Sequence, residues 1–185
     1  MKKNILFLGD GIYTKNLLKY FNDKNFNRYL VDLKILNPRK KKFKKTYETN
    51  LLDKKKILKI AKKLKINHVI TNQNDFAIPV YGYLCSKLKL KGIPEKICNR
   101  FTNKKKCRLY LKKKVSCRTY IPNFYLNYKK IPKNNHKKNF IVKPINMQGS
   151  RYVEKVKYNL LNNKINILKK KNINFIIEEY IEGID

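Results

Sequence analysis

Short apolar runs alternate with amphipathic helical patterns over the first ninety residues, and this alternation restricts the fold more than any other feature. The apolar runs are bounded by glycine and polar residues, which is typical of buried strands. Strands are predicted at residues 5–8, 29–36 and 66–71, and helices at 13–21, 53–64 and 76–88. Strands that alternate with helices form a parallel sheet, so the sequence predicts an α/β fold of the Rossmann-like, doubly wound kind.

A glycine turn follows the first strand. Gly9, Asp10 and Gly11 stand between that strand and a helical pattern, which is where a helix N-terminus can bind an anion. A dinucleotide-binding site is one hypothesis, because Asp32 lies at a suitable distance, although Thr14 occupies the position of the third glycine of the fingerprint. A tight turn without a dinucleotide is the alternative.

The stretch from Phe140 to Arg151 combines a predicted strand with a small flexible loop. Phe140 to Val142 are apolar, Lys143 follows them directly, and Pro144 ends regular pairing. Gln148, Gly149 and Ser150 then offer backbone N–H groups and a hydroxyl that can surround phosphate oxygens, with Lys143 as a point charge. The stretch therefore suits a polyphosphate, and a hairpin with a solvated lysine is the alternative.

Two further segments lie before and after this stretch. In the segment 101–111, Thr102 or Asn103 is the predicted N-cap of a helix, with Lys104 in its first turn. The segment 175–185 is a predicted strand that leads into Glu178 and Glu179. Other predicted elements of this half are a strand at 120–126 and a helix at 159–171 with Leu160, Leu161, Ile165 and Leu168 on its apolar side.

Taken in order, Asn-Lys at a helix start, Val-Lys-Pro before a Gly-Ser loop, and Glu-Glu-Tyr-Ile-Glu-Gly resemble the nucleotide-binding half of the ATP-grasp family. The resemblance implies a pre-ATP-grasp α/β domain at 1–98, followed at 99–185 by the first part of an α+β ATP-grasp domain. It also implies ATP binding as part of a carboxylate–amine or carboxylate–thiol ligase. Such ligases act through an acylphosphate.

The resemblance also implies roles for individual residues. Lys104 and Lys143 would contact the α- and β-phosphates of ATP, and Gly149 and Ser150 would form the loop over the phosphates. Glu178 would accept the adenine amino group, and the backbone of Glu179, Tyr180 and Ile181 would bind the other edge of the base. Asp185 would hold the ribose hydroxyls. Tyr152 departs from the family's Arg-Gly-Val pattern, which predicts a stiffer or reshaped loop.

The family uses Mg²⁺ to neutralise the transferred phosphoryl group, and its metal ligands lie beyond the adenine strand. The sequence stops at Asp185, so no metal ligands are assigned here. We therefore expect a truncated ligase, a fragment, or one half completed by another chain or copy, inactive alone. An unfinished sheet predicts uncovered apolar faces at 175–177.

Charge supports an alternative from another class. The 46 Lys and Arg residues against 12 Asp and Glu give a net charge of +34, which attracts polyanions nonspecifically. A basic nucleic-acid-binding protein, with tyrosines stacking on bases, is thus possible in principle. Dedicated binders favour arginine, however, and this chain has only six, at positions 28, 39, 100, 108, 118 and 151.

The cysteines bear on metal binding and compartment. Cys85, Cys98, Cys107 and Cys117 form no CxxC pair, so a zinc site is not predicted. Free thiols without a signal peptide indicate a cytoplasmic protein, and charge interrupts every apolar run well short of the roughly twenty residues of a membrane span.

Overall fold

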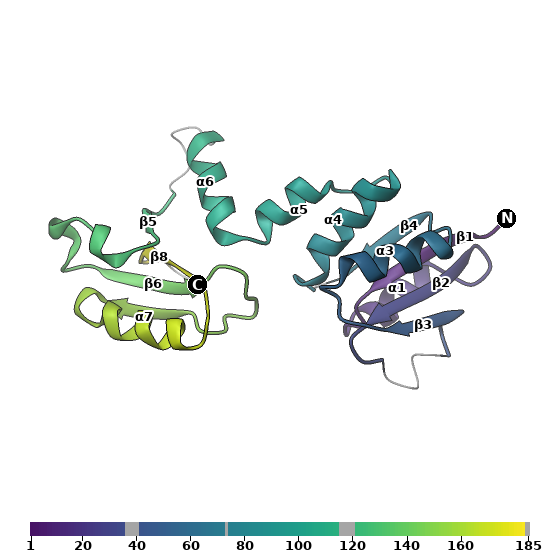
Figure 1. Ribbon diagram of the computed structural model, residues 1–185, viewed down its shortest axis with the longest axis horizontal. Coiled ribbons are helices and arrows are strands. Elements are labelled where there is room, and N and C mark those ends of the chain that lie inside the picture. The colour runs from purple at the N-terminus through teal and green to yellow at the C-terminus, as the bar shows by residue number, and fades with distance from the viewer. Residues whose placement is uncertain (36–40, 73, 115–120, 184–185) are drawn as a thin grey trace. The chain divides into compact units, whose positions relative to one another are not determined.

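The computed structural model describes residues 1–35, 41–72, 74–114 and 121–183. They form two compact units, residues 1–102 and residues 103–185 (Figure 1). The division lies between Thr102 and Asn103, whereas the sequence places it after Cys98.

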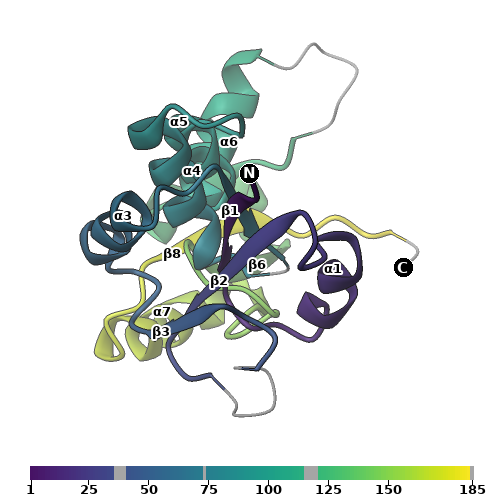
Figure 2. The same ribbon diagram turned by 90° about the vertical axis from the view of Figure 1, so that its right-hand side faces the viewer.

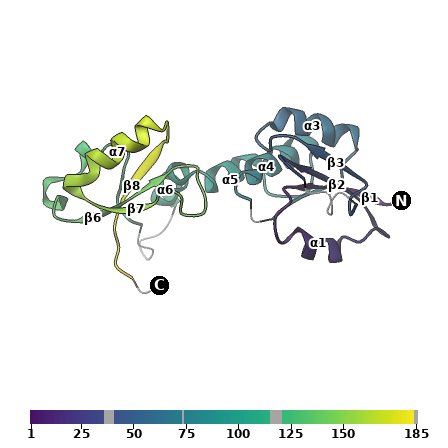
Figure 3. The same ribbon diagram turned by 90° about the horizontal axis from the view of Figure 1, so that it is seen from below.

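The first unit is a three-layer α/β unit. Its elements are β1 (Lys3–Leu8), α1 (Thr14–Tyr20), β2 (Phe26–Asp32), β3 (Lys45–Glu48), α3 (Lys54–Lys63), β4 (His68–Thr71), α4 (Ala77–Leu88) and α5 (Glu95–Phe101). The strands are all parallel in the order β3-β2-β1-β4. Helix α1 covers one face of this sheet and α3 the other (Figures 2 and 3). The predicted doubly wound parallel sheet is therefore confirmed.

The central strand explains why the sheet needs cover on both faces. Leu6 and Leu8 pack into a core with Ile57 of α3 and Leu84 of α4. The intervening side chains of β1, such as Phe7, point to the opposite face and pack in a second core with side chains of α1. A strand that is apolar at every position is stable only when both of its faces are covered.

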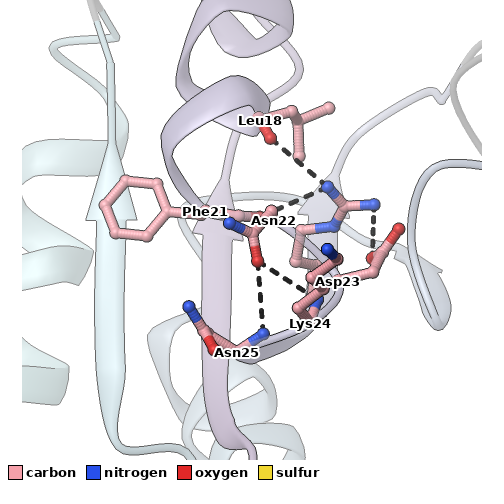
Figure 4. Close-up of polar contacts among 7 residues, drawn as sticks. Leu18, Phe21, Asn22, Asp23, Lys24 and Asn25 are labelled. Atoms are coloured by element: carbon pink, nitrogen blue, oxygen red, sulfur yellow. Dashed lines mark hydrogen bonds and ion pairs between the residues drawn. The ribbon is translucent and has the colours of Figure 1, made fainter.

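Arg28 closes the end of α1. Its Nη1 donates to the carbonyl oxygens of Leu18 at 3.4 Å and Phe21 at 3.2 Å, and its Nη2 lies 2.5 Å from a carboxylate oxygen of Asp23 (Figure 4). The last carbonyl groups of a helix have no partner within the helix and carry partial negative charge, so a cation here stabilises the helix end. Arg28 is thus a buried structural residue.

Two elements of this unit were not predicted from the sequence. Strand β3 has only four residues, and its lysine-rich approach has no strand-like alternation. Helix α5 has seven residues and begins directly after Pro94. Elements this short contain too few residues for their periodicity to be recognised. The predicted strand 29–36 also lies earlier, because β2 begins at Phe26 and ends at Asp32.

The second unit is an antiparallel sheet with one face packed against helix α7 (Figure 1). Its elements are α6 (Lys104–Lys114), β5 (Phe124–Tyr125), β6 (Asn139–Pro144), β7 (Glu154–Lys157), α7 (Leu161–Lys170) and β8 (Phe175–Glu179), with short 3-10 turns at 128–130, 133–135 and 158–160. The strand order is β5-β8-β6-β7. Leu161, Ile165 and Leu168 of α7 pack on Phe140 and Val142 of β6.

Three predictions about this unit are corrected. Leu160 is half exposed because it lies in the turn before α7 rather than on its apolar side. The described part of the predicted strand 120–126 is a strand only at Phe124 and Tyr125. The expected uncovered face at 175–177 is also wrong, since Ile176 and Ile177 are 0% exposed.

Within the described residues, no helix combines the length and apolar character needed to cross a membrane.

Candidate functional site

Glu178 is the centre of a charged cluster in the second unit. Arg108 of α6 donates from Nε to Oε1 at 2.8 Å and from Nη2 to Oε2 at 3.0 Å. Lys143 of β6 lies with its Nζ 2.7 Å from Oε2, and the Glu178 side chain is only 5% exposed. Two cations therefore hold one buried carboxylate, and residues from three distant segments of the sequence meet there.

The alternation of β6 explains how this cluster forms. Phe140, Val142 and Pro144 are buried, whereas Lys143 points to the opposite face of the sheet and is partly buried. Glu178 stands directly opposite Ile141 in the β6–β8 ladder. Because paired residues of antiparallel strands share a face, Glu178 and Lys143 lie on the same side, away from α7. The alternative of a solvated Lys143 is excluded, since its side chain is 18% exposed and ion-paired.

The electrostatics favour an ionised Glu178. Burial is the largest single influence, and it raises the pKa of the carboxyl group. The hydrogen bonds and charges of Arg108 and Lys143 lower the pKa, and their combined effect exceeds that of burial. The net pKa lies below the ordinary value for a glutamate. The same hydrogen bond is the main reason why the pKa of Arg108 is raised. Both groups are thus charged at neutral pH, and Glu178 is an acceptor only.

The first turn of α6 is fastened to the loop after β6. Asn103 caps the helix by accepting from Lys106 N at 2.9 Å, which confirms the predicted N-cap, and it donates to Asn146 Oδ1 at 2.9 Å. Lys104 donates from its backbone N to Ile145 O at 3.0 Å and from Nζ to Met147 O at 2.7 Å. The two predicted phosphate-binding segments therefore lie in direct contact.

The loop between β6 and β7 has an unusual backbone. Gly149, Ser150 and Tyr152 have φ values of +65°, +53° and +59°. Gly149 faces open space, since a Cβ atom added there would meet nothing within 4 Å. Tyr152 stands where the family pattern has glycine, and its φ value lies in the left-handed region that glycine adopts most easily. The Nζ of Lys171 lies 4.9 Å from the centroid of the Tyr152 ring.

Glu179 lies on the opposite face from Glu178. It accepts hydrogen bonds from Asn123 Nδ2 at 3.0 Å and Asn135 Nδ2 at 3.2 Å, and Lys138 Nζ lies 3.7 Å away. Both glutamates are buried, so the end of β8 is not solvated. Because successive residues of a strand point to opposite faces, only Glu178 belongs to the cluster with Arg108 and Lys143.

Glu179 and Tyr180 still pair with the start of β6, and the chain leaves the sheet after them. The N–H groups of Glu179 and Tyr180 donate to Asn123 O and Asn139 O, each at 3.0 Å. Lys155 places its Nζ 3.7 Å from the Tyr180 ring centroid. Ile181 is exposed, and Asp185 lies outside the described residues.

The glycine turn of the first unit is occupied by internal hydrogen bonds. Asp32 accepts from Asp10 N at 2.6 Å and from Leu33 N at 2.6 Å, and Gly9 N donates to Val31 O at 2.9 Å. A pyrophosphate would need these N–H groups and would also face the Asp32 carboxylate. The arrangement favours the tight-turn interpretation over a dinucleotide site.

Metal ligands and thiols add nothing to the cluster. Over the described ranges, no three His, Cys, Asp or Glu side chains come together as a metal ion would require. Cys85, Cys98 and Cys107 are free thiols, and Cys85 and Cys98 are buried, with pKa values raised chiefly by that burial. Cys117 lies outside the described residues.

Arg108 is the member of the cluster that sequence reasoning missed. It is one of many cations in a lysine-rich segment, so composition does not distinguish it. Its spacing does, because Arg108 follows Lys104 by four residues and therefore shares a helical face with it. Arg108 is the only arginine of α6, and it is the residue of this helix that pairs with Glu178.

The chain thus combines a parallel α/β unit with an antiparallel unit that brings together a helix-start lysine, a strand lysine and a paired strand glutamate. No family model matches the sequence, and the comparison with curated proteins gives no match. Solved structures do match, over almost all of this chain.

Three matches illustrate the likeness. An L-amino acid ligase from Bacillus licheniformis has a TM-score of 0.76 at 15% identity, covering 98% of this chain and 45% of that one. A phosphoribosylglycinamide synthetase from Anaerococcus prevotii has a TM-score of 0.70 at 20% identity, covering 99% of this chain and 47% of that one. A carboxyaminoimidazole ribonucleotide synthase from Aspergillus clavatus, complexed with ATP, has a TM-score of 0.71 at 13% identity, covering 97% of this chain and 47% of that one.

These likenesses define the fold. The predicted ATP-grasp resemblance is confirmed at this level, since matches to ligases of this kind cover both units. The chain spans about half the length of these three solved structures.

Proposed function

We propose that the second unit binds ATP, as the N-terminal, nucleotide-binding part of an ATP-dependent carboxylate–amine or carboxylate–thiol ligase that acts through an acylphosphate. One observation carries the proposal: the helix start at Asn103 and Lys104, the strand lysine Lys143 with the loop after it, and the strand end at Glu178 are joined by direct contacts. Three solvated, unrelated segments would not meet in this way. The matched structures include complexes with ADP and with ATP, which supports a nucleotide as the ligand.

The roles of the residues follow from their chemistry. Lys104 and Lys143 supply positive charge for the α- and β-phosphates, and Gly149 and Ser150 lie on an exposed loop that can cover them. Glu178 neutralises its cations in the unliganded protein and faces the adenine amino group in the complex. Since the N–H groups of Glu179 and Tyr180 donate within the protein, Ile181 N is the donor that we assign to the base. Asp185 is assigned to the ribose hydroxyls.

Magnesium enters the proposal only as a partner of the nucleotide. The family domain uses Mg²⁺ to neutralise the phosphoryl group in transfer. The described carboxylates do not form a cradle for it, since Glu178 is held by Arg108 and Lys143, and Glu179 is held by amides on the other face. We therefore assign no metal ligand and derive no transfer step within these residues.

Calorimetric titration with a nonhydrolysable ATP analogue tests the proposal. Lys143→Ala is expected to weaken binding at least about tenfold, because it removes a charge-assisted contact worth more than about 1.5 kcal/mol. Lys41→Ala is the matched control, since Lys41 is an exposed lysine of the basic run 39–45. Equal losses in the two variants would mean that bulk charge, and not a site, attracts the nucleotide.

A further inference from the structure

Glu178 has more cationic partners than a single carboxylate needs. Arg108 contacts both of its oxygens, and Lys143 contacts Oε2 as well. The three groups carry a net charge of +1, which favours the approach of an anion from solvent. If Lys143 binds a nucleotide phosphate, its ammonium must leave Oε2. Without another partner, Glu178 would then be an ionised carboxylate that is buried and unpaired, which is strongly unfavourable.

We propose that Arg108 is a positioning residue that keeps Glu178 neutralised and fixed while the Lys143 ammonium moves from Glu178 to the phosphates of the nucleotide. This inference rests on the proposed function and deepens it. Arg108 touches no part of the nucleotide. It acts by making Lys143 available, because Glu178 retains two hydrogen bonds after Lys143 has left.

The geometry suits Arg108 to remain and Lys143 to leave. The guanidinium fork binds the carboxylate in a bidentate way, which a lysine cannot do. Arg108 also stands on a helix whose first turn is held by Asn103 and Lys104, so its backbone is fixed from a second direction. Lys143, in contrast, makes one contact through a flexible four-carbon side chain and is 18% exposed, so a small rotation brings its ammonium to solvent.

A purely structural role for Arg108 is the competing explanation. Helix α6 has no buried residue, and the Arg108 pair is one of the polar contacts that attach it to the rest of the second unit. If Arg108 served only to hold α6 in place, its loss would weaken nucleotide binding whether or not Glu178 were charged. The two explanations therefore differ in how Arg108 and Glu178 variants combine.

The experiment is a double-mutant cycle in the full chain, with a nonhydrolysable ATP analogue titrated into Arg108→Met, Glu178→Gln and the double variant. Arg108→Met is expected to weaken binding about tenfold, because Lys143 stays bound to an otherwise unpaired carboxylate. Glu178→Gln removes that charge, so the double variant is expected to bind several-fold more tightly than Arg108→Met. A structural role would not be repaired in this way. Lys106→Met on the same helix, an exposed residue, is the matched control.

Each outcome decides between the explanations. If Arg108→Met binds like Lys106→Met, or if Glu178→Gln gives no recovery, the inference is wrong. If Arg108→Met does not fold, Arg108→Gln replaces it in the cycle, since it also removes the charge but keeps a polar side chain. Absence of analogue binding by the unmodified chain would overturn the proposed function, and this inference with it, whereas binding by the unmodified chain with no recovery would overturn only the inference.

Discussion

Arg108 and Glu178 are 70 residues apart in the sequence and form a two-point ion pair, with Arg108 Nε 2.8 Å from one carboxylate oxygen and Nη2 3.0 Å from the other. The pair joins α6 to β8. Helix α6 fully buries none of its own side chains. This ion pair and the Nζ of Lys112, 5.2 Å from the ring centroid of Phe124, attach it to the sheet, and its first turn is attached to the loop after β6. Several of the contacts that hold α6 are therefore also contacts of the candidate site.

Glu178→Gln is expected to destabilise the second unit by about 2 to 3 kcal/mol at pH 7, because it leaves two partly buried cations without their carboxylate. The folded pKa of Glu178 lies below its ordinary value. The ion pair therefore contributes its full stability above the unfolded pKa, which is about 4.3, and loses it as the pH falls through the lower folded pKa.

Urea unfolding of the unmodified chain and the variant, at pH 7 and at pH values below 4, measures this difference. The difference in unfolding free energy between the unmodified chain and Glu178→Gln is expected to shrink as the pH falls. Glu182→Gln is the control, since Glu182 is an exposed residue of the same segment. A gap that did not change with pH, or an equal loss in the control, would contradict the assignment of the stability to the ion pair.

Gly149→Ala is expected to cost about 1 kcal/mol of unfolding free energy, because an L-residue at a left-handed φ is strained. No steric clash adds to this cost, since the new Cβ atom would meet open space. Gly183→Ala is the matched control, because Gly183 also faces open space and has no left-handed φ. Thermal unfolding of both variants gives the comparison, and equal effects would mean that the loop conformation is not as described.

Binding to mixed-sequence DNA is expected to be nonspecific and to fade steeply as salt rises from about 50 to 200 mM, since it would depend on counterion release by lysines. Fluorescence anisotropy with two unrelated duplexes tests this. We expect equal affinities for both at every salt concentration. A complex that distinguished the two duplexes and survived at the higher salt would favour the nucleic-acid-binding alternative over the ligase proposal.

The sequence predicts the layers of the first unit well because its strands are apolar on both faces. Leu6 and Leu8 on one side and Phe7 on the other require cover from two helical layers, which the alternating pattern supplies. It predicts β3 and α5 poorly because each is short, and β3 lies at the sheet edge with half-exposed side chains. Edge elements are stabilised by pairing with a neighbour, which local sequence does not reveal.

The candidate site could be predicted only in part for a related reason. The motifs containing Lys104, Lys143 and Glu178 are recognisable because each stands at the end of a regular element. The partner of Glu178 is not recognisable from these motifs, since whether Arg108 or a nearby lysine reaches the sheet depends on how α6 lies in three dimensions. The sequence does not predict the burial of residues 175–177 for the same reason: Ile176 lies on the face away from α7, and its burial depends on the tertiary arrangement.

A polypeptide of residues 1–185 is expected to bind Mg-ATP without releasing phosphate. Transfer of the γ-phosphoryl group needs Mg²⁺ held between oxygen ligands and the outer phosphates. The described carboxylates after the loop are already engaged, because Glu154 pairs with Lys164, Glu178 with Arg108 and Lys143, and Glu179 with amide groups on the opposite face. Only the exposed Glu182 lies outside these contacts among those we can assign, and one carboxylate does not fix an octahedral ion.

Phosphate release from Mg-ATP, measured with and without a panel of amino acids as carboxylate and amine donors, checks this expectation. Lys143→Ala serves as the control, because it removes the proposed nucleotide contact and leaves Glu178 paired with Arg108. We expect the same background rate for both proteins in every mixture. A carboxylate-dependent rate in the unmodified chain that disappeared in Lys143→Ala would show that these 185 residues assemble a working transfer site, and that Glu178 or Glu179 exchanges its present partners for a metal ion during turnover.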